Sequence, residues 1–123
     1  MSGRYLLDTN ALIYAINRKL RLPRADYAIS VITRMELLSW PELSEDEESQ
    51  LKSALSAIKV LQLTPSIEDA AVKIRRATSL KLPDSIIAAT AIDGGYVLIT
   101  DDEKLKSRHV GKSQSLDELV YTK

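Results

Sequence analysis

Five acidic residues in this chain adjoin apolar segments that are typical of strands or buried helices. Asp8 directly follows the apolar end of RYLL, and Asp101 and Asp102 follow YVLIT. Asp84 begins the apolar segment DSIIAATAI, and Glu36 lies among apolar neighbours in TRMELLSW. Carboxylate oxygens are the ligands that hard divalent cations such as Mg²⁺ and Mn²⁺ prefer. If these side chains converge, they predict a metal site built from carboxylates.

The chemistry of such a site follows from its charge. Crowded carboxylates raise each other's pKa, and a divalent cation neutralises them. Such a cation binds phosphate, lowers the pKa of a coordinated water and stabilises charge on a leaving oxygen, and two ions roughly 4 Å apart can hold both reacting oxygens. These are the requirements of phosphodiester hydrolysis. The chain has no Cys, and its one His, His109, adjoins none of these acids, which argues against a zinc site with nitrogen and sulfur ligands.

Each acid has a simpler explanation when it is taken alone. Asp8 and Asp84 stand where helices are expected to begin, so either one could be a helix N-cap. Asp101 and Asp102 could cap a short helix that follows them, and Glu36 could be a solvated helix residue. The joint pattern, and not any single residue, favours a metal site.

The elements that would position these acids alternate between strand and helix. Short apolar runs predict strands over residues 4–7, 27–30, 60–63 and 96–99, with a very short fifth strand at 109–110. Helical spacing and capping signals predict helices over residues 11–17, 31–40, 44–59, 66–80, 84–93, 103–107 and 115–121. Strands without polar alternation are typical of a parallel sheet that is covered on both faces. We therefore expect an α/β fold with a parallel sheet of four to five short strands, in a single domain over residues 1–123.

Capping signals mark the ends of several of these helices. Ser44 with Glu47 predicts a capping box, and Ser66 with an acid three residues later predicts a second cap. The pair Gly94-Gly95 predicts the end of the apolar helix that begins at Asp84.

The order of the elements brings the acids to one edge of the sheet. In an open parallel sheet, ligands bind beyond the carboxyl ends of the strands. Asp8 ends the first strand, and Asp101 and Asp102 lie just beyond the fourth. Helices that run antiparallel to the strands begin near the same edge, and Asp84 and Glu36 lie close to such helix starts. We expect at least four of these carboxylates, from separate segments, to meet there.

The overall charge gives no sign of a general polyanion binder. Lys and Arg number 17 and so do Asp and Glu, so contact with a nucleic acid would need a local basic patch. The candidate RNA-binding residues are Arg18, Lys19, Arg21 and Arg24, after the first helix, and Arg34, near the expected acid site. A solvated loop explains the first four equally well.

No segment reads as a signal peptide or is apolar over a length that would span a bilayer. The absence of Cys fits a reducing compartment. We expect a cytoplasmic protein that makes no membrane contact.

Four segments, LLDTNALIYA, ISVITRMELLSW, LKLPDSIIAATAI and YVLITDDEKL, follow one another along nearly the whole chain. Together they resemble the PIN domain family, and specifically its small single-domain ribonucleases of the VapC toxin type. The resemblance implies a three-layer α/β/α sandwich around the parallel sheet, and cleavage of RNA that depends on one or two Mg²⁺ or Mn²⁺ ions. It also implies a homodimer and a cognate antitoxin protein that inserts a peptide into the acidic pocket.

Matched residue by residue, the resemblance assigns catalysis and metal binding to four acids, Asp8, Glu36, Asp84 and Asp102. Asp101 is the alternative for the fourth position, and Leu105 stands where the family often has an aromatic residue. Asn10 and Thr100 match polar positions that would hold the carboxylates or water in place.

Three other functions share parts of this pattern. A housekeeping RNA-processing PIN nuclease could share every residue named here. A non-catalytic PIN-like binding module typically lacks one or more acids, whereas this chain keeps all of them. A receiver-like signalling domain would need an acidic pair near the first strand end and an Asp ending the third strand. Here the first strand ends at Asp8 alone, and the third runs into Thr64-Pro65.

Overall fold

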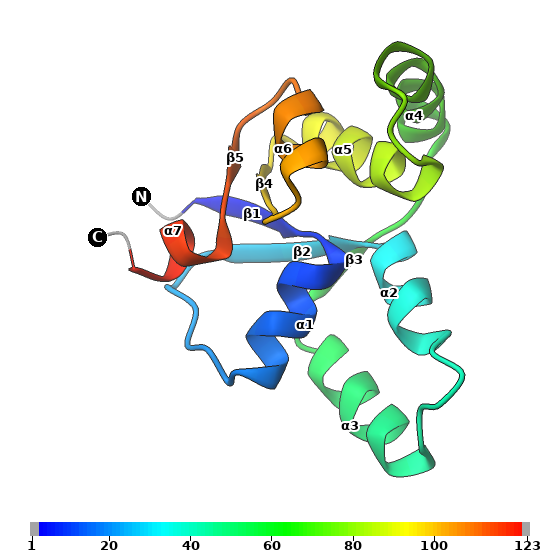
Figure 1. Ribbon diagram of the computed structural model, residues 1–123. Helices are drawn as coiled ribbons and strands as arrows, with labels where there is room; N and C mark the ends of the chain where they lie inside the picture. The colour runs from blue at the N-terminus through cyan, green and yellow to red at the C-terminus, as the bar shows by residue number, and fades with distance from the viewer. Residues whose placement is uncertain (1–2, 122–123) are drawn as a thin grey trace.

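The computed structural model describes residues 3–121, which form a five-stranded sheet with helices on both faces (Figure 1). All neighbouring strands are parallel, in the order β3-β2-β1-β4-β5. The strands are β1 (Arg4–Leu7), β2 (Asp26–Ser30), β3 (Lys59–Leu61), β4 (Val97–Ile99) and β5 (Ser113–Gln114). The helices are α1 (Thr9–Asn17), α2 (Val31–Leu38), α3 (Glu45–Leu55), α4 (Pro65–Thr78), α5 (Leu82–Gly94), α6 (Glu103–Arg108) and α7 (Leu116–Tyr121). Among these described residues, no helix has the length and apolar character needed to cross a membrane. The predicted α/β fold with a parallel sheet is confirmed.

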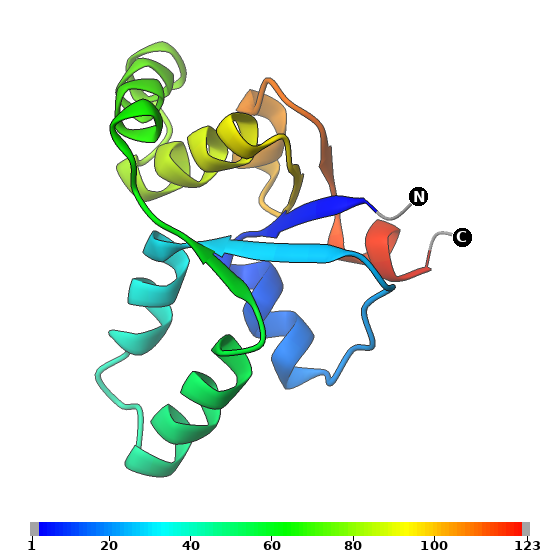
Figure 2. The same cartoon turned by 180° about the vertical axis from the view of Figure 1, so that it is seen from behind.

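Successive residues of the central strand β1 pack into opposite layers, because side chains alternate between the faces of a sheet. Leu6 is buried with Ile87 and Leu98 in the layer that contains α5 and α6. Leu7 is buried with Leu12 and other residues of α1, α2, α3 and α7 in the opposite layer. Figure 2 shows the same division, with α4, α5 and α6 on one side of the sheet and the remaining helices on the other. The chain therefore forms the three layers that the resemblance implies.

The register between β1 and β4 places the residues that follow these strands next to each other. Leu7 pairs with Ile99 across the two parallel strands. The backbone N–H of Asp8 then donates to the carbonyl oxygen of Ile99 at 3.0 Å. Asp8 and Thr100 therefore leave the sheet together, at its carboxyl edge.

Helix α5 is buried on almost every side, and this burial fixes the position of Asp84 in its first turn. All residues from Ser85 to Ala91 are buried. One side packs against the sheet, and the other packs Ala89 against Ala71 of α4. The helix ends at Gly95, whose φ of 70° lies in the left-handed region that favours glycine. The predicted end of this helix is confirmed.

The fifth strand consists of Ser113–Gln114, so its prediction at residues 109–110 is wrong. Ser113 pairs with Leu98 and Gln114 with Ile99. Both residues of β5 are polar and half-buried, so no apolar run marks this strand in the sequence. His109 instead caps the end of α6 with its backbone and is buried.

The capping box at Ser44 is confirmed, but the predicted cap at Ser66 is wrong. The cap of α4 is Thr64, whose hydroxyl oxygen accepts a hydrogen bond from the backbone N–H of Ile67 at 3.2 Å. Pro65 fills the first helical position, where its missing N–H is not needed. The cap of α4 therefore lies two residues earlier than the Ser66 signal indicates.

Candidate active site

Asp8 is a helix cap and a buried acid at the same time. It is buried at the carboxyl edge of β1, with 5% relative exposure. Oδ1 accepts a hydrogen bond from the backbone N–H of Ala11 at 2.8 Å, which caps α1. Oδ2 accepts a hydrogen bond from the hydroxyl of Thr100. Each carboxylate oxygen keeps a further lone pair, so capping leaves Asp8 able to bind a cation.

Thr100 connects two acidic segments through one buried hydroxyl group. The hydroxyl donates to Asp8 and accepts a hydrogen bond from the backbone N–H of Asp102 at 3.0 Å. The Asp102 carboxylate in turn caps α6 by accepting from the N–H of Leu105 at 3.0 Å. The end of β1 and the start of α6 are therefore held in one hydrogen-bonded chain.

Glu36 is held from α1 by a residue that the sequence interpretation missed. The hydroxyl of Thr9 donates to Oε1 of Glu36 at 2.6 Å and lies 3.2 Å from the hydroxyl of Thr33. Glu36 itself is exposed. Asn10 is exposed too, and within residues 3–121 its side chain makes no hydrogen bond to an acid. Thr9, the residue directly after Asp8, therefore supports Glu36, and Asn10 makes no such hydrogen bond among the described residues.

Asp84 is the third residue of α5 and not its N-cap. The N-cap is Lys81, which makes no side-chain capping hydrogen bond. Asp84 is half-buried, and among the described residues its carboxylate accepts no hydrogen bond from the protein. A carboxylate that is partly desolvated and unpaired in this way is chemically suited to act as a ligand of a cation.

The acids interact electrostatically across four segments of the chain. Burial raises the pKa of Asp8, the hydrogen bonds from Thr100 and Ala11 oppose this rise, and the charges of Asp84 and Asp101 add to it. Burial also raises the pKa of Asp84, and the nearby charges of Asp102 and Glu36 raise it further. The predicted acids are therefore close enough to repel one another, as crowded carboxylates do.

The donor set fits a hard cation, although the side chains are not closed around one point. Among residues 3–121, no three acidic, His or Cys side chains lie close enough together to share a metal ion. The available donors are carboxylate oxygens, and Mg²⁺ and Mn²⁺ prefer such oxygens. Asp8, Glu36 and Asp84 would hold such an ion, together with Asp101 or Asp102.

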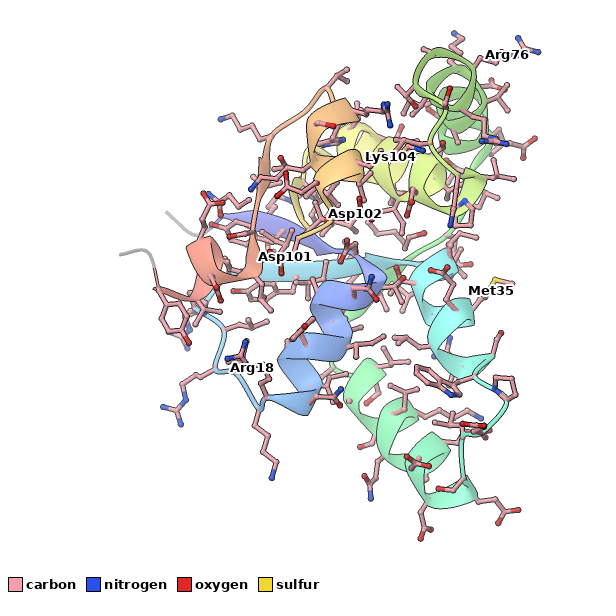
Figure 3. The ribbon with its side chains drawn as sticks, in the orientation of Figure 1. Arg18, Met35, Arg76, Asp101, Asp102 and Lys104 are labelled. Atoms are coloured by element: carbon pink, nitrogen blue, oxygen red, sulfur yellow. The ribbon has the colours of Figure 1, made fainter. Side chains whose placement is uncertain are left out.

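Asp101 and Asp102 have different structural roles. Figure 3 shows both at the start of the segment that leads from the sheet into α6. Oδ1 of Asp101 accepts a hydrogen bond from the backbone N–H of Leu116 at 3.3 Å, so this acid supports the start of α7. Asp102 caps α6 and raises the pKa of Asp84. Asp101 acts electrostatically on Asp8, so both acids border the site.

The basic cluster after α1 lies away from these acids. Arg18 follows α1 and Arg24 precedes β2, so the loop between them lies at the amino edge of the parallel sheet. Nine residues of α1, about 13 Å of helix, separate it from Asp8. Figure 3 shows Arg18 at the end of α1 remote from Asp101 and Asp102. The same placement holds for Lys19 and Arg21, whereas Arg34 lies on α2, two residues before Glu36.

Two lysines that the sequence interpretation overlooked stand beside the acids. Lys81 and Lys104 both act electrostatically on Asp84 and partly offset the rise in its pKa. One precedes Asp84 by three residues and the other follows Asp102 by two. Their spacing to the acids was the available signal.

The sequence matches the PIN domain family over residues 5–110. The chain belongs to the PIN domain family. This match spans all five acids as well as Thr9 and Thr100, and PIN domains are typically metal-dependent nucleases. Among curated protein sequences, none matches this chain.

Solved toxin–antitoxin structures match this PIN domain across most of its length. A chain of a toxin–antitoxin complex from Klebsiella pneumoniae is 28% identical, with a TM-score of 0.76, and the match covers 91% of this chain and 97% of that one. VapBC from Salmonella typhimurium, solved bound to DNA, gives 24% identity and a TM-score of 0.77 over 94% and 99% of the two chains. VapBC2 from Rickettsia felis was solved with a DNA fragment from its promoter. It is 23% identical, with a TM-score of 0.77, and the match covers 91% of this chain and 98% of that one. The PIN domain described here has the fold of VapC toxins.

Proposed function

We propose that this PIN domain is a metal-dependent endoribonuclease and the toxin of a VapBC-type toxin–antitoxin pair. One observation carries the proposal. The buried carboxylate of Asp8 is fixed by Thr100 at the sheet edge where the charges of Glu36 and Asp102 act on Asp84. Repulsion of this kind is tolerated where a cation and a phosphate are to be bound.

The residues would divide the work as follows. Asp8, Glu36, Asp84 and Asp102, with Asp101 as the alternative fourth acid, would hold one or two Mg²⁺ or Mn²⁺ ions. When bound, such ions polarise the phosphate, acidify water and stabilise charge on the leaving oxygen. Thr100 and Thr9 hold the Asp8 and Glu36 carboxylates in place. One of the carboxylates accepts the proton of the attacking water, and hydrolysis leaves a 5′-phosphate and a 3′-hydroxyl.

Cleavage of a labelled RNA in Mg²⁺ and in EDTA tests the catalytic part of the proposal. We expect cleavage by the wild-type protein in Mg²⁺ only, and none by Asp8→Asn. The matched control is Asp69→Asn, which changes an exposed acid on α4, outside the site. Circular dichroism of each variant verifies the fold. Cleavage by Asp8→Asn at the wild-type rate would overturn the site assignment, and equal cleavage with and without Mg²⁺ would overturn the role of the metal.

We further propose an antitoxin as partner, and a groove on the α1, α2 and α3 side offers it an apolar surface. The groove has a volume of about 480 Å³ and is lined mostly by apolar side chains, among them Ile13, Ile16, Leu37, Trp40 and Leu51. Trp40 is 57% exposed, which leaves a large apolar side chain open to a partner. The relatives solved as toxin–antitoxin complexes support this partner class.

Expression in a bacterial host tests the toxin role. Induction is expected to arrest growth, and co-expression of the protein encoded beside this gene is expected to relieve the arrest. Trp40→Asp is expected to abolish relief, whereas Val72→Asp, at an exposed valine of α4, is expected to preserve it. Cleavage of RNA without growth arrest would favour a housekeeping nuclease, and the absence of both would favour a non-catalytic binding module. The cytoplasmic location and the homodimer stay predictions, and light scattering on the purified protein measures the latter.

A further inference from the structure

Two lysines stand next to acids of the site without forming close ion pairs with them. Lys81 immediately precedes α5, and Lys104 is the second residue of α6. Both side chains are exposed. Within residues 3–121, the ion pairs found join Lys52 to Glu48 and Lys106 to Glu118, so neither flanking lysine has an acid in direct contact. Both ammonium groups are therefore available to a ligand that approaches the site.

Helix stability does not explain the positions of these lysines. The first turn of a helix presents unpaired N–H groups and the positive end of the helix dipole, where cations are unfavourable. The helices α1 to α4 and α6 each begin with a residue whose side chain accepts a hydrogen bond from a backbone N–H of the first turn. These residues are Asp8, Ser30, Ser44, Thr64 and Asp102. Lys81 occupies this position in α5 and offers no acceptor. Lys104 adds a cation to the first turn of α6. Residues that are locally unfavourable at a functional edge point to a role in function.

The site needs a source of attraction for a polyanion. Its carboxylates repel an approaching phosphate backbone, and the chain as a whole carries no net charge. The basic loop that contains Arg18 and Arg24 lies at the opposite edge of the sheet. Figure 3 shows Lys104 on α6, on the same side of the molecule as Asp102. Lys81 stands at the start of α5, three residues before Asp84, and Lys104 stands in the first turn of α6, which Asp102 caps, so each lysine lies next to an acid of the site.

We propose that Lys81 and Lys104 bind backbone phosphates of the RNA beside the bond that is cleaved. The inference rests on the proposed nuclease function and names residues that hold its substrate next to the acidic site. Lysine is suited to this role because its ammonium group binds phosphate as a point charge and is free to rotate. The basic loop at the amino edge then has no part in substrate binding.

Binding of a fluorescent single-stranded RNA by the Asp8→Asn protein, measured in Mg²⁺ over a range of salt concentrations, tests this inference. Each phosphate contact contributes about 0.7 to the slope of log affinity against log salt. Lys81→Gln and Lys104→Gln are each expected to weaken binding and to reduce the slope by about 0.7, and the double variant by about 1.4. Lys81→Arg and Lys104→Arg are expected to retain the slope.

The matched control is the double variant Lys19→Gln and Arg21→Gln, which removes two cations from the opposite edge. We expect an unchanged slope. Unchanged binding in the Lys81 and Lys104 variants, or an equal loss in the control, would overturn the inference. If the two lysines only offset the charge of Asp84, their Gln variants would change thermal stability without changing the salt slope, and that result also overturns it. Cleavage by the wild-type protein separates the two proposals. If the protein cleaves RNA and its binding does not depend on either lysine, only this inference is refuted. If it neither binds nor cleaves RNA, both proposals are refuted.

Discussion

The hydroxyl of Thr100 donates a hydrogen bond to Oδ2 of Asp8, across the carboxyl ends of β1 and β4. Ninety-two residues separate the two in sequence. The register of the parallel strands, with Leu7 opposite Ile99, brings them together. The same hydroxyl accepts a hydrogen bond from the backbone N–H of Asp102, so the positions of Asp8 and Asp102 both depend on one buried oxygen atom.

Thr100→Val is the direct test of this arrangement. It removes the donor to Asp8 and the acceptor for Asp102 while it preserves the shape of the side chain. We expect the free energy of unfolding to fall by about 1–3 kcal/mol, because buried polar groups lose their partners, and RNA cleavage to fall with it. Urea denaturation and a cleavage assay measure the two effects. Thr100→Ser keeps the hydroxyl and is expected to keep most of both. A loss in Ser without a loss in Val would show that the methyl group matters instead of the hydroxyl.

The pH dependence of stability reports on the buried acid. Burial raises the pKa of Asp8, against the hydrogen bonds from Thr100 and Ala11. The folded chain therefore holds this proton more tightly than the unfolded chain does. The contribution of Asp8 to stability is then fully present below the unfolded pKa, about 4, and declines as pH rises toward the folded pKa.

The comparison of wild type with Asp8→Asn isolates this effect. In EDTA, the unfolding free energy of wild type minus that of the variant is expected to decrease from pH 4 upward and then level off. Denaturation curves at several pH values measure it. A difference that grows with pH would contradict the raised pKa of Asp8.

Metal binding should appear as a gain in stability. A ligand that binds only the folded state at 100 times its dissociation constant stabilises it by about 2.7 kcal/mol. We expect Mg²⁺ to raise the melting temperature of the wild-type protein and to have a much smaller effect on Asp84→Asn, whose unpaired carboxylate is lost. Thermal denaturation with Mg²⁺ and with EDTA measures both. Asp69→Asn should respond as wild type does, and an equal response from Asp84→Asn would remove this residue from the metal site.

The two adjacent acids after β4 can be separated by isosteric substitution. Asp102→Asn should leave α6 capped, because Asn caps helices about as well as Asp does, yet it removes a charge that acts on Asp84. We expect it to reduce cleavage strongly with little change in stability. Asp101→Asn is expected to reduce cleavage less. The opposite order in a cleavage assay would make Asp101 the fourth acid.

Much of this architecture was predictable because strong local signals agreed with the tertiary structure. The apolar segment that begins at Asp84 is buried almost all round, and the helix ends where Gly95 permits a left-handed backbone. Asp8 follows the β1 run of apolar residues and caps α1, as its position indicated. The strand β5 escaped prediction because Ser113–Gln114 carries no apolar pattern and exists only through pairing with β4.

The parts of the site that the sequence did not reveal depend on side chains that meet in space. The hydrogen bond from Thr9 to Glu36 joins α1 to α2, and nothing in the local sequence indicates it. The cluster of basic residues around Arg18 drew attention by composition, but α1 carries the chain to the other edge of the sheet. Lys81 stands apart from other basic residues, and Lys104 lies in the ordinary mixed-charge segment EKLKSR, so composition gave no reason to select them.

The separation between the two edges of the sheet has a practical use. The loop between α1 and β2 joins the elements at the edge remote from Asp8, and its residues Arg18 and Lys19 are exposed. A fluorophore, an affinity tag or a surface tether attached there would report on the protein or immobilise it while the acidic edge stays open to solution. This loop is therefore the attachment point of choice for single-molecule and biosensor experiments on this chain.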